Sequence, residues 1–284
     1  MSAGTLATWI AAVFAVGSAY VSLRGAAEVA RRSLAMSVAF AALAAGFLLR
    51  ALALADHQVA FVARNVLQAD AASARVLAIF AEPAGAGLVV AAVVGAVGWW
   101  SGRLATNAWR SGVVAAVVLV LLAASLSGAP LALLPFRPAD GAMTLPYFVH
   151  PAAMVAALAL LAQVASATMA FVSALMRLQG EDTATTVVRF QLMALVAAAI
   201  QAMAWMVASV ASGTSDELLV LVARDGIWLA TVLVSALALR IQVHGNASAL
   251  AGTEASLAAL LASIACVLGT GGASSAGVPA IALS

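Results

Sequence analysis

Long apolar runs alternate with short polar connections along this chain of 284 residues. The runs are each about 20 residues long, which is the length that an α-helix needs to cross a hydrocarbon layer roughly 30 Å thick. They lack the strict alternation of apolar and polar positions that is typical of membrane β-strands. The pattern predicts an all-α, polytopic helical membrane protein with a single integral membrane domain over residues 1–284.

Eight of the apolar runs are long enough for us to assign them as membrane helices. We place these helices at residues 5–23, 34–55, 76–100, 112–134, 150–178, 190–212, 225–243 and 256–269. An even number of spans puts both chain ends on one side of the membrane. Between the second and third spans, residues 56–75 carry apolar side chains at roughly helical spacing among polar ones, so this segment is either an amphipathic helix on the membrane surface or an ordered loop.

The arginines predict the orientation, because basic residues concentrate in cytoplasmic connections. All 13 basic residues are Arg, and the chain has no Lys. One side of the predicted bundle holds Arg24, Arg31, Arg32, Arg103, Arg110, Arg177, Arg189 and Arg240, whereas the other side holds Arg64, Arg75, Arg137 and Arg224. This bias predicts that both the N-terminus and the C-terminus lie outside.

The composition excludes several classes of function. Hydrophobic residues make up 65% of the chain and charged residues 8%, so we expect the lipid bilayer as its surroundings. The absence of Lys excludes a Schiff-base mechanism, and without a dense basic cluster we expect no nucleic acid as a partner. The single cysteine, Cys266, excludes an intrachain disulfide. No hydrolase or phosphate-binding motif occurs, so we do not expect an enzyme.

A few polar residues fall inside the apolar runs, where each needs a partner or a water-filled cavity. Arg50 and Glu82 are expected at comparable depths on consecutive antiparallel helices, which predicts an intramembrane ion pair between them. Gln163 and Gln201 lie near the middle of their spans, and we expect their amides to form hydrogen bonds across helices.

The three histidines suggest a metal site at the outer face. His57 and His150 both fall at the outer ends of predicted helices, and Met154 lies one helical turn beyond His150. Imidazole and thioether ligands suit copper, so His57, His150 and Met154 form a candidate copper site. A simpler alternative is that His150, which precedes Pro151, only caps the start of its helix.

The segment from His150 to Gly245 resembles the copper-resistance D family of bacterial inner-membrane proteins. The resemblance is carried by the run HPAAMVAALALL from His150, by Arg189 and Phe190 with the following QLMAL, and by the apolar run that contains Gly226. The family's Trp-Gly-Gly is replaced here by residues 157–159. The resemblance implies copper uptake or handling in the bacterial inner membrane, with a periplasmic copper donor as a partner and His150 at the point of metal entry.

Two other functions fit the same residues. The first is a membrane anchor or electron-transfer subunit of a respiratory complex that binds quinone or one b-type haem, because His57 and His150 could supply the two axial ligands that such a haem commonly needs. The second is a scaffold subunit without a cofactor, which would pack against other membrane subunits through Ala- and Gly-lined helix faces.

Overall fold

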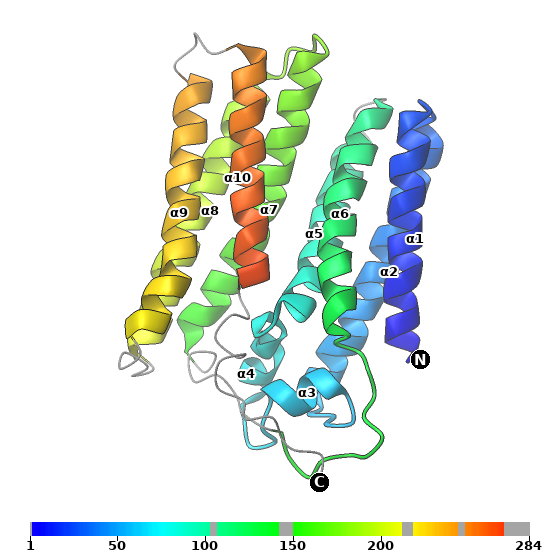
Figure 1. Ribbon diagram of the computed structural model, residues 1–284, viewed down its shortest axis with the longest axis vertical. Helices are drawn as coiled ribbons and strands as arrows, with labels where there is room; N and C mark the ends of the chain where they lie inside the picture. The colour runs from blue at the N-terminus through cyan, green and yellow to red at the C-terminus, as the bar shows by residue number, and fades with distance from the viewer. Residues whose placement is uncertain (1, 103–106, 142–149, 212–217, 244–247, 270–284) are drawn as a thin grey trace.

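The computed structural model describes residues 2–102, 107–141, 150–211, 218–243 and 248–269, and for residues 218–226 it describes the backbone alone. Over these ranges the chain is a bundle of long helices with no β-strand (Figure 1). The long helices are α1 (Ala3–Leu23), α2 (Ala27–Ala53), α5 (Pro83–Gly102), α6 (Ala108–Gly128), α7 (Pro151–Leu178), α8 (Ala184–Ala211), α9 (Leu218–Val243) and α10 (Ala249–Gly269).

Seven of these helices are long and apolar enough to cross a membrane. The exception is α9, in which the stretch with described side chains, Ile227–Val243, is apolar but shorter. The prediction of an all-α, multi-pass membrane protein is therefore confirmed.

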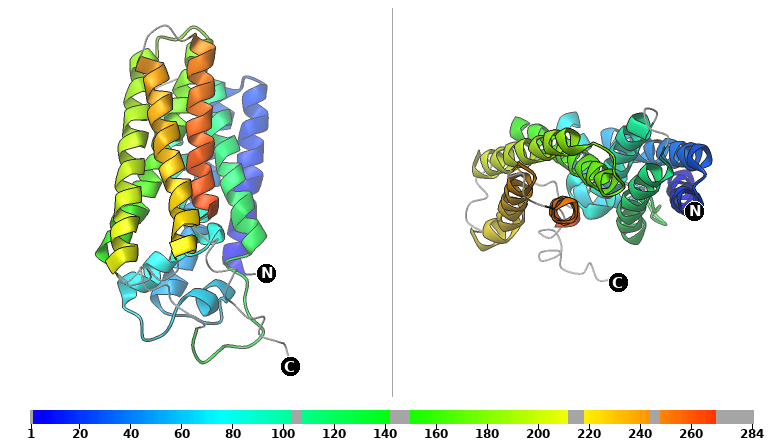
Figure 2. Two further views of the ribbon diagram at one scale, coloured as in Figure 1. Left: turned by 60° about the vertical axis from the view of Figure 1, so that its left-hand side comes forward. Right: turned by 90° about the horizontal axis from the view of Figure 1, so that it is seen from above.

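The long helices form two groups (Figure 2). We call α1, α2, α5 and α6 the N-terminal bundle, and α7, α8, α9 and α10 the C-terminal bundle. The two bundles meet where α5 packs against α7 and α10, and where α6 packs against α7. Asn107, just before α6, reinforces this contact because its Nδ2 donates to the Met176 sulfur at 3.2 Å and to the Gln179 side-chain oxygen at 2.9 Å.

Serine hydroxyls fasten the first two helices of the N-terminal bundle to each other. Ser18 on α1 donates to the Ala30 carbonyl of α2 at 2.8 Å. In the opposite direction, Ser33 and Ser37 on α2 donate to carbonyl oxygens of α1, each at 2.8 Å. Such bonds hold membrane helices together without a hydrophobic driving force, because lipid tails are as apolar as the side chains that the helices bury.

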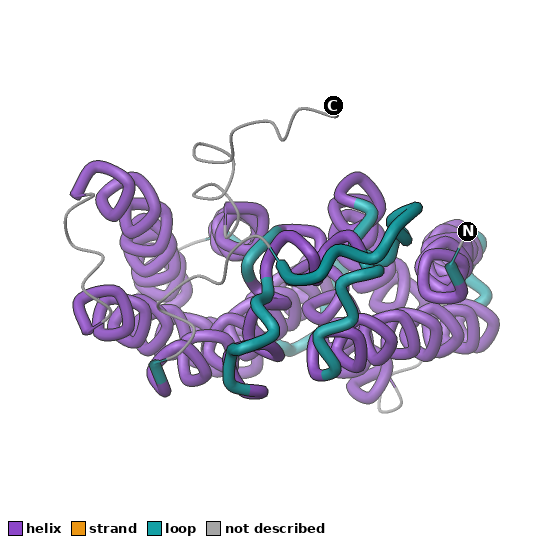
Figure 3. Tube along the Cα trace, turned by 90° about the horizontal axis from the view of Figure 1, so that it is seen from below, coloured by secondary structure: helices purple, strands orange, loops and turns teal. Residues whose placement is uncertain are grey.

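Two connections at one end of the bundle fold together into a cap, which we define as residues 54–82 and 129–141 (Figure 3). The first connection contains α3 (Ala60–Asn65), α4 (Ala72–Leu77) and the 3-10 turn η1 (Ala78–Phe80). The two connections pair through an isolated antiparallel bridge between Val59 and Leu133. The side chains of Phe61 and Val62 are fully buried. Residues 56–75 are thus an ordered loop with two short helices rather than a helix lying on the membrane surface.

Several helix boundaries differ from the predicted ones, for local reasons. The second helix starts at Ala27 rather than 34, since Glu28 pairs with Arg31 and Arg32 one turn later and supports the added turns. The third span starts at Pro83 rather than 76, because Pro lacks the N–H that would continue a preceding helix.

The remaining differences lie in the later spans. The fourth helix ends at Gly128 rather than 134, where Ala129 adopts a left-handed conformation with φ of 42° and Pro130 follows. The predicted fifth helix agrees with α7 to within one residue. The last three helices begin at Ala184, Leu218 and Ala249, six or seven residues before the predicted 190, 225 and 256.

The first residue of α1 and the last residue of α10 both lie toward the cap end of the bundle (Figure 1). This arrangement agrees with an even number of membrane crossings. The charge pattern predicts that the cap end faces outside.

We expect Gly85→Ala to destabilise the protein by about 1–3 kcal/mol, the usual cost of overpacking. A Cβ at Gly85 would overlap the Ile79 carbonyl oxygen and would lie 2.8 Å from the Phe61 ring. Gly46→Ala is the matched control, because a Cβ at Gly46 on α2 meets no atom within 4 Å. Thermal unfolding of both variants in detergent tests the expectation, and equal midpoints for the two variants would contradict it.

Candidate functional site

His150 caps the start of α7. Its Nδ1 accepts a hydrogen bond from the Ala152 backbone N–H at 3.1 Å, and Pro151 occupies the first helical position. Because the Nδ1 lone pair is engaged, the neutral imidazole carries its proton on Nε2. Neither ring nitrogen then offers a lone pair to a metal while the hydrogen bond to the Ala152 N–H is formed.

His57 is buried in the cap, with 2% of its surface exposed. Its Nε2 lies 3.1 Å from the Val66 carbonyl oxygen, to which it donates, and 3.8 Å from the Asp140 carboxylate. Asp140 accepts hydrogen bonds from the backbone N–H groups of Gln68 and Gly141, and these bonds, with a smaller contribution from His57, hold the pKa of its carboxyl below the usual range. His57 therefore lies between the two halves of the cap, with a hydrogen bond to Val66 in the first half and the Asp140 carboxylate of the second half nearby.

Met154 points away from the bundle. Its side chain is 48% exposed and lies on the same outward face as Leu158, whereas Ala153 and Ala157 face the interior. Among the described residues, no group of three or more His, Cys, Asp or Glu side chains is placed to hold a metal. The copper site at His57, His150 and Met154 stays a prediction, and the observed hydrogen bonds favour capping and bracing roles for the two histidines.

Glu82 pairs with Arg64 instead of the predicted Arg50. Two parallel hydrogen bonds of 3.0 Å join the Arg64 guanidinium to the Glu82 carboxylate, and the Asn65 amide adds a third at 2.8 Å. The chain reverses through α3, and this reversal brings Arg64 next to Glu82. The depths of residues along the predicted helices do not reveal this contact. Arg50 forms no ion pair with any residue that the structure describes. Its side chain instead lines a separate pocket.

Three glutamines lie in the interior of the C-terminal bundle. Gln163 on α7 and Gln191 and Gln201 on α8 are each at most 1% exposed. No buried Asp, Glu or Arg accompanies them among the side chains that the structure describes. The interior of this bundle is thus polar but uncharged.

The first polar level of this interior joins α8 to α9. The Gln191 Nε2 donates to the Ser235 carbonyl oxygen at 3.5 Å. The Gln191 Oε1 and the Ser235 hydroxyl are both buried and have no hydrogen-bond partner among the described residues. The Gln191 Oε1, which accepts, and the Ser235 hydroxyl, which donates or accepts, therefore belong to neighbouring residues but are both unsatisfied.

The second polar level lies deeper. The Gln163 Nε2 donates to the Ser263 hydroxyl of α10 at 3.1 Å, and the Thr231 hydroxyl lies 3.0 Å from the Cys266 sulfur. The bond from Gln163 confirms the expected contact across helices. Within the part of the chain that the structure describes, the Gln163 Oε1 and the Gln201 Nε2 have no hydrogen-bond partner.

The two unpaired amide atoms lie at a similar depth. At a rise of about 1.5 Å per residue, Gln163 lies about 22 Å from Leu178 at the end of α7, and Gln201 lies about 25 Å from Ala184 at the start of α8. The two helices are joined at those ends and pack along their length. An unpaired acceptor and an unpaired donor thus occur on neighbouring helices near the middle of the bundle.

These four unpaired atoms make the interior of the C-terminal bundle the candidate functional site. Each buried polar group without a partner costs about 1–3 kcal/mol, and no bulk water reaches a hydrocarbon layer to offset that cost. Sequence reasoning found Gln163 and Gln201 but missed Gln191 and Ser235. The available signal was that Gln191 and Gln201 are ten residues apart, a spacing that places them within about 80° of each other around a helix.

No protein-family model, curated protein or solved structure matches the chain. The resemblance to the copper-resistance D family consequently stays a prediction from the quoted motifs.

We expect His150→Ala to destabilise the protein by about 1 kcal/mol through loss of the helix cap, and His150→Asn to have little effect, because Asn is a favoured capping residue. Unfolding in detergent together with copper analysis of the purified protein tests this. Copper that is bound by the unchanged protein and lost in both variants would instead support a ligand role for His150.

We expect Glu82→Gln to destabilise the protein by about 1 kcal/mol, because it leaves Arg64 without its carboxylate partner. Arg50→Gln should leave the free energy of unfolding within about 0.5 kcal/mol of the original value. The comparison uses denaturation of both variants in the same detergent. A larger loss for Arg50→Gln than for Glu82→Gln would show that Arg50, rather than Arg64, supports the fold.

Proposed function

We propose that this membrane protein is a permease for a small, uncharged, polar solute, which crosses the membrane through the interior of the C-terminal bundle. The observation that carries the proposal is the set of four buried polar atoms without a partner, namely Gln163 Oε1, Gln191 Oε1, Gln201 Nε2 and Ser235 Oγ. A passing solute or water would satisfy these atoms in turn.

The placement of the polar groups supports a path rather than a single pocket. The level at Gln191 and Ser235 lies about 10 Å from the start of α8, whereas Gln163 and Gln201 lie near the middle of the bundle. Toward the end opposite the cap, the Gln242 amide donates to the Gly252 carbonyl oxygen and to the Ser256 hydroxyl, at 2.6 and 3.1 Å. Polar side chains therefore recur from the end opposite the cap to near the middle of this bundle.

The kind of polar atom indicates the kind of solute. Two of the unpaired atoms are amide oxygens that only accept, one is an amide nitrogen that only donates, and the hydroxyl does either. A solute with both donors and acceptors matches this mixture, whereas the carbonyl oxygens of a quinone only accept. An ion would need charged or multiple carbonyl ligands, and the described interior contains no buried carboxylate or guanidinium.

Stopped-flow swelling of proteoliposomes tests the proposal, with water, urea and glycerol as the probes. We expect at least one of these probes to enter faster than in protein-free vesicles. The double substitution Gln191→Leu with Ser235→Ala should abolish that excess. It should also leave the protein as stable as before or more stable, because replacing unpaired buried polar groups by apolar ones is neutral or favourable.

Thr168→Val is the matched control. Thr168 is buried on α7, where its hydroxyl donates to the Val164 carbonyl oxygen of its own helix at 2.8 Å. This variant should keep the flux. Permeability equal to that of protein-free vesicles for all three probes, or an equal loss of flux in the control and in the double variant, would overturn the proposal.

A further inference from the structure

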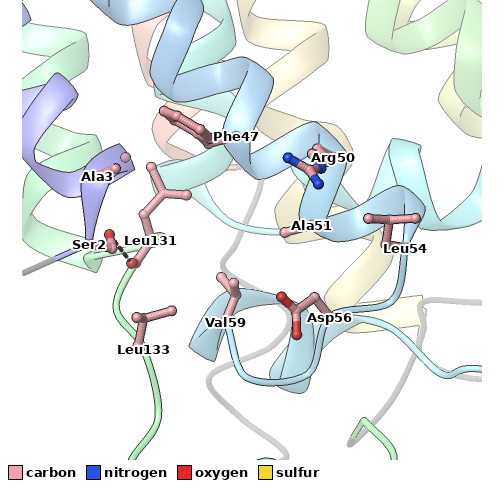
Figure 4. Close-up of a pocket in the computed structure, with 11 residues that line it drawn as sticks. Ser2, Ala3, Phe47, Arg50, Ala51, Leu54, Asp56, Val59, Leu131 and Leu133 are labelled. Atoms are coloured by element: carbon pink, nitrogen blue, oxygen red, sulfur yellow. Dashed lines mark hydrogen bonds between the residues drawn. The ribbon is translucent and has the colours of Figure 1, made fainter.

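A pocket of about 340 Å³ opens at the cap end of the N-terminal bundle (Figure 4). It lies between the first residues of α1, the last turn of α2 and the cap segment after α6. Its lining includes Phe47, Arg50, Leu54, Asp56, Leu131 and Leu133. Most of this lining is apolar, and the two charged side chains have opposite sign.

The two charges share the pocket without pairing with each other. Arg50 lies in the last turn of α2 and forms no ion pair with any described residue. Asp56 follows the end of that helix, and its carboxylate lies 3.6 Å from the Arg137 guanidinium. Figure 4 shows the side chains of Arg50 and Asp56 entering the pocket from α2 and from the cap. A positive and a negative group are thus held apart across a space that a ligand can occupy.

We propose that this pocket binds the headgroup of a phospholipid that carries a phosphate and a primary ammonium, as phosphatidylethanolamine does. The Arg50 guanidinium binds the phosphate, for which its planar set of donors is well shaped. The ammonium group donates to the Asp56 carboxylate. Phe47 and Leu54 on α2 contact the glycerol and the first acyl carbons.

The position in the fold favours a lipid as the source of this headgroup. Arg50 lies at the end of a membrane-spanning helix, which is the depth at which lipid phosphates lie, and the apolar side chains beside it continue toward the hydrocarbon. Asp56 disfavours a purely anionic headgroup by repulsion. A choline headgroup has no N–H to donate to Asp56, and Phe47 is the one aromatic side chain of the lining, too few for a cage around a quaternary ammonium.

Native mass spectrometry of the full chain tests the proposal, in detergent with equal amounts of phosphatidylethanolamine, phosphatidylcholine and phosphatidylglycerol. We expect phosphatidylethanolamine to be retained about fivefold more than either other lipid, the ratio typical of one exposed ionic contact. Arg50→Gln should lose bound lipid of all three kinds. Asp56→Asn should remove the preference for phosphatidylethanolamine over phosphatidylcholine while phosphate binding persists.

Two control variants separate the pocket from general charge effects. Arg24→Gln removes a cation at the opposite end of the bundle, where Arg24 contacts Tyr20. Arg137→Gln removes the ionic neighbour of Asp56 but keeps the Asp56 carboxylate. Both should retain the lipid preference. Equal retention of the three lipids by the unchanged protein, or unchanged retention in Arg50→Gln, would overturn the proposal.

Discussion

The absence of water from the hydrocarbon layer is the constraint on which this structure depends, because every buried polar group must then find its partner within the protein. The N-terminal bundle meets much of this demand, although the Arg110 Nε on α6 is buried without a hydrogen-bond partner among the described residues. Ser18, Ser33 and Ser37 donate to carbonyl oxygens of the facing helix, and the unpaired hydroxyl of Ser125 borders a pocket of about 140 Å³. Among the described residues of the C-terminal bundle, Gln163, Gln191, Gln201 and Ser235 each leave a buried polar atom without a hydrogen-bond partner. For this reason we place the candidate functional site in the C-terminal bundle.

The same constraint explains the cap. Two of its polar groups are satisfied locally, namely Glu82 by Arg64 and Asn65, and His57 by the Val66 carbonyl oxygen. These contacts let a connection with several ionisable residues fold tightly against the helix ends instead of extending into solvent. Residues that attract attention as possible metal ligands thereby acquire structural roles. Arg50 has no ion-pair partner among the described residues. A ligand with an anionic group could therefore pair with it in the pocket that it lines.

The contact between the two bundles joins these roles. α7 supplies Gln163 to the interior of the C-terminal bundle and also presents Met169 and Met176 to the N-terminal bundle, where Ser101 and Asn107 bond to their sulfur atoms. One helix therefore faces both the proposed path and the supporting bundle. A shift of α7 would therefore alter both contacts together.

The sequence by itself determined the all-α membrane architecture, because runs of about 20 apolar residues have no other stable form in a bilayer. It also offered His150 before Pro151 as the N-terminal capping residue of α7, as an alternative to a metal ligand, and the structure shows the capping hydrogen bond. Tertiary structure alone decided which groups meet. Arg64 reaches Glu82 only because α3 reverses the chain, and Met154 faces outward because of how α7 is rotated against its neighbours. Gln191 and Ser235 lie 44 residues apart and meet only when α8 packs on α9. Hydropathy fixes how deep a residue lies but not its rotational or lateral position, and those two coordinates define the site.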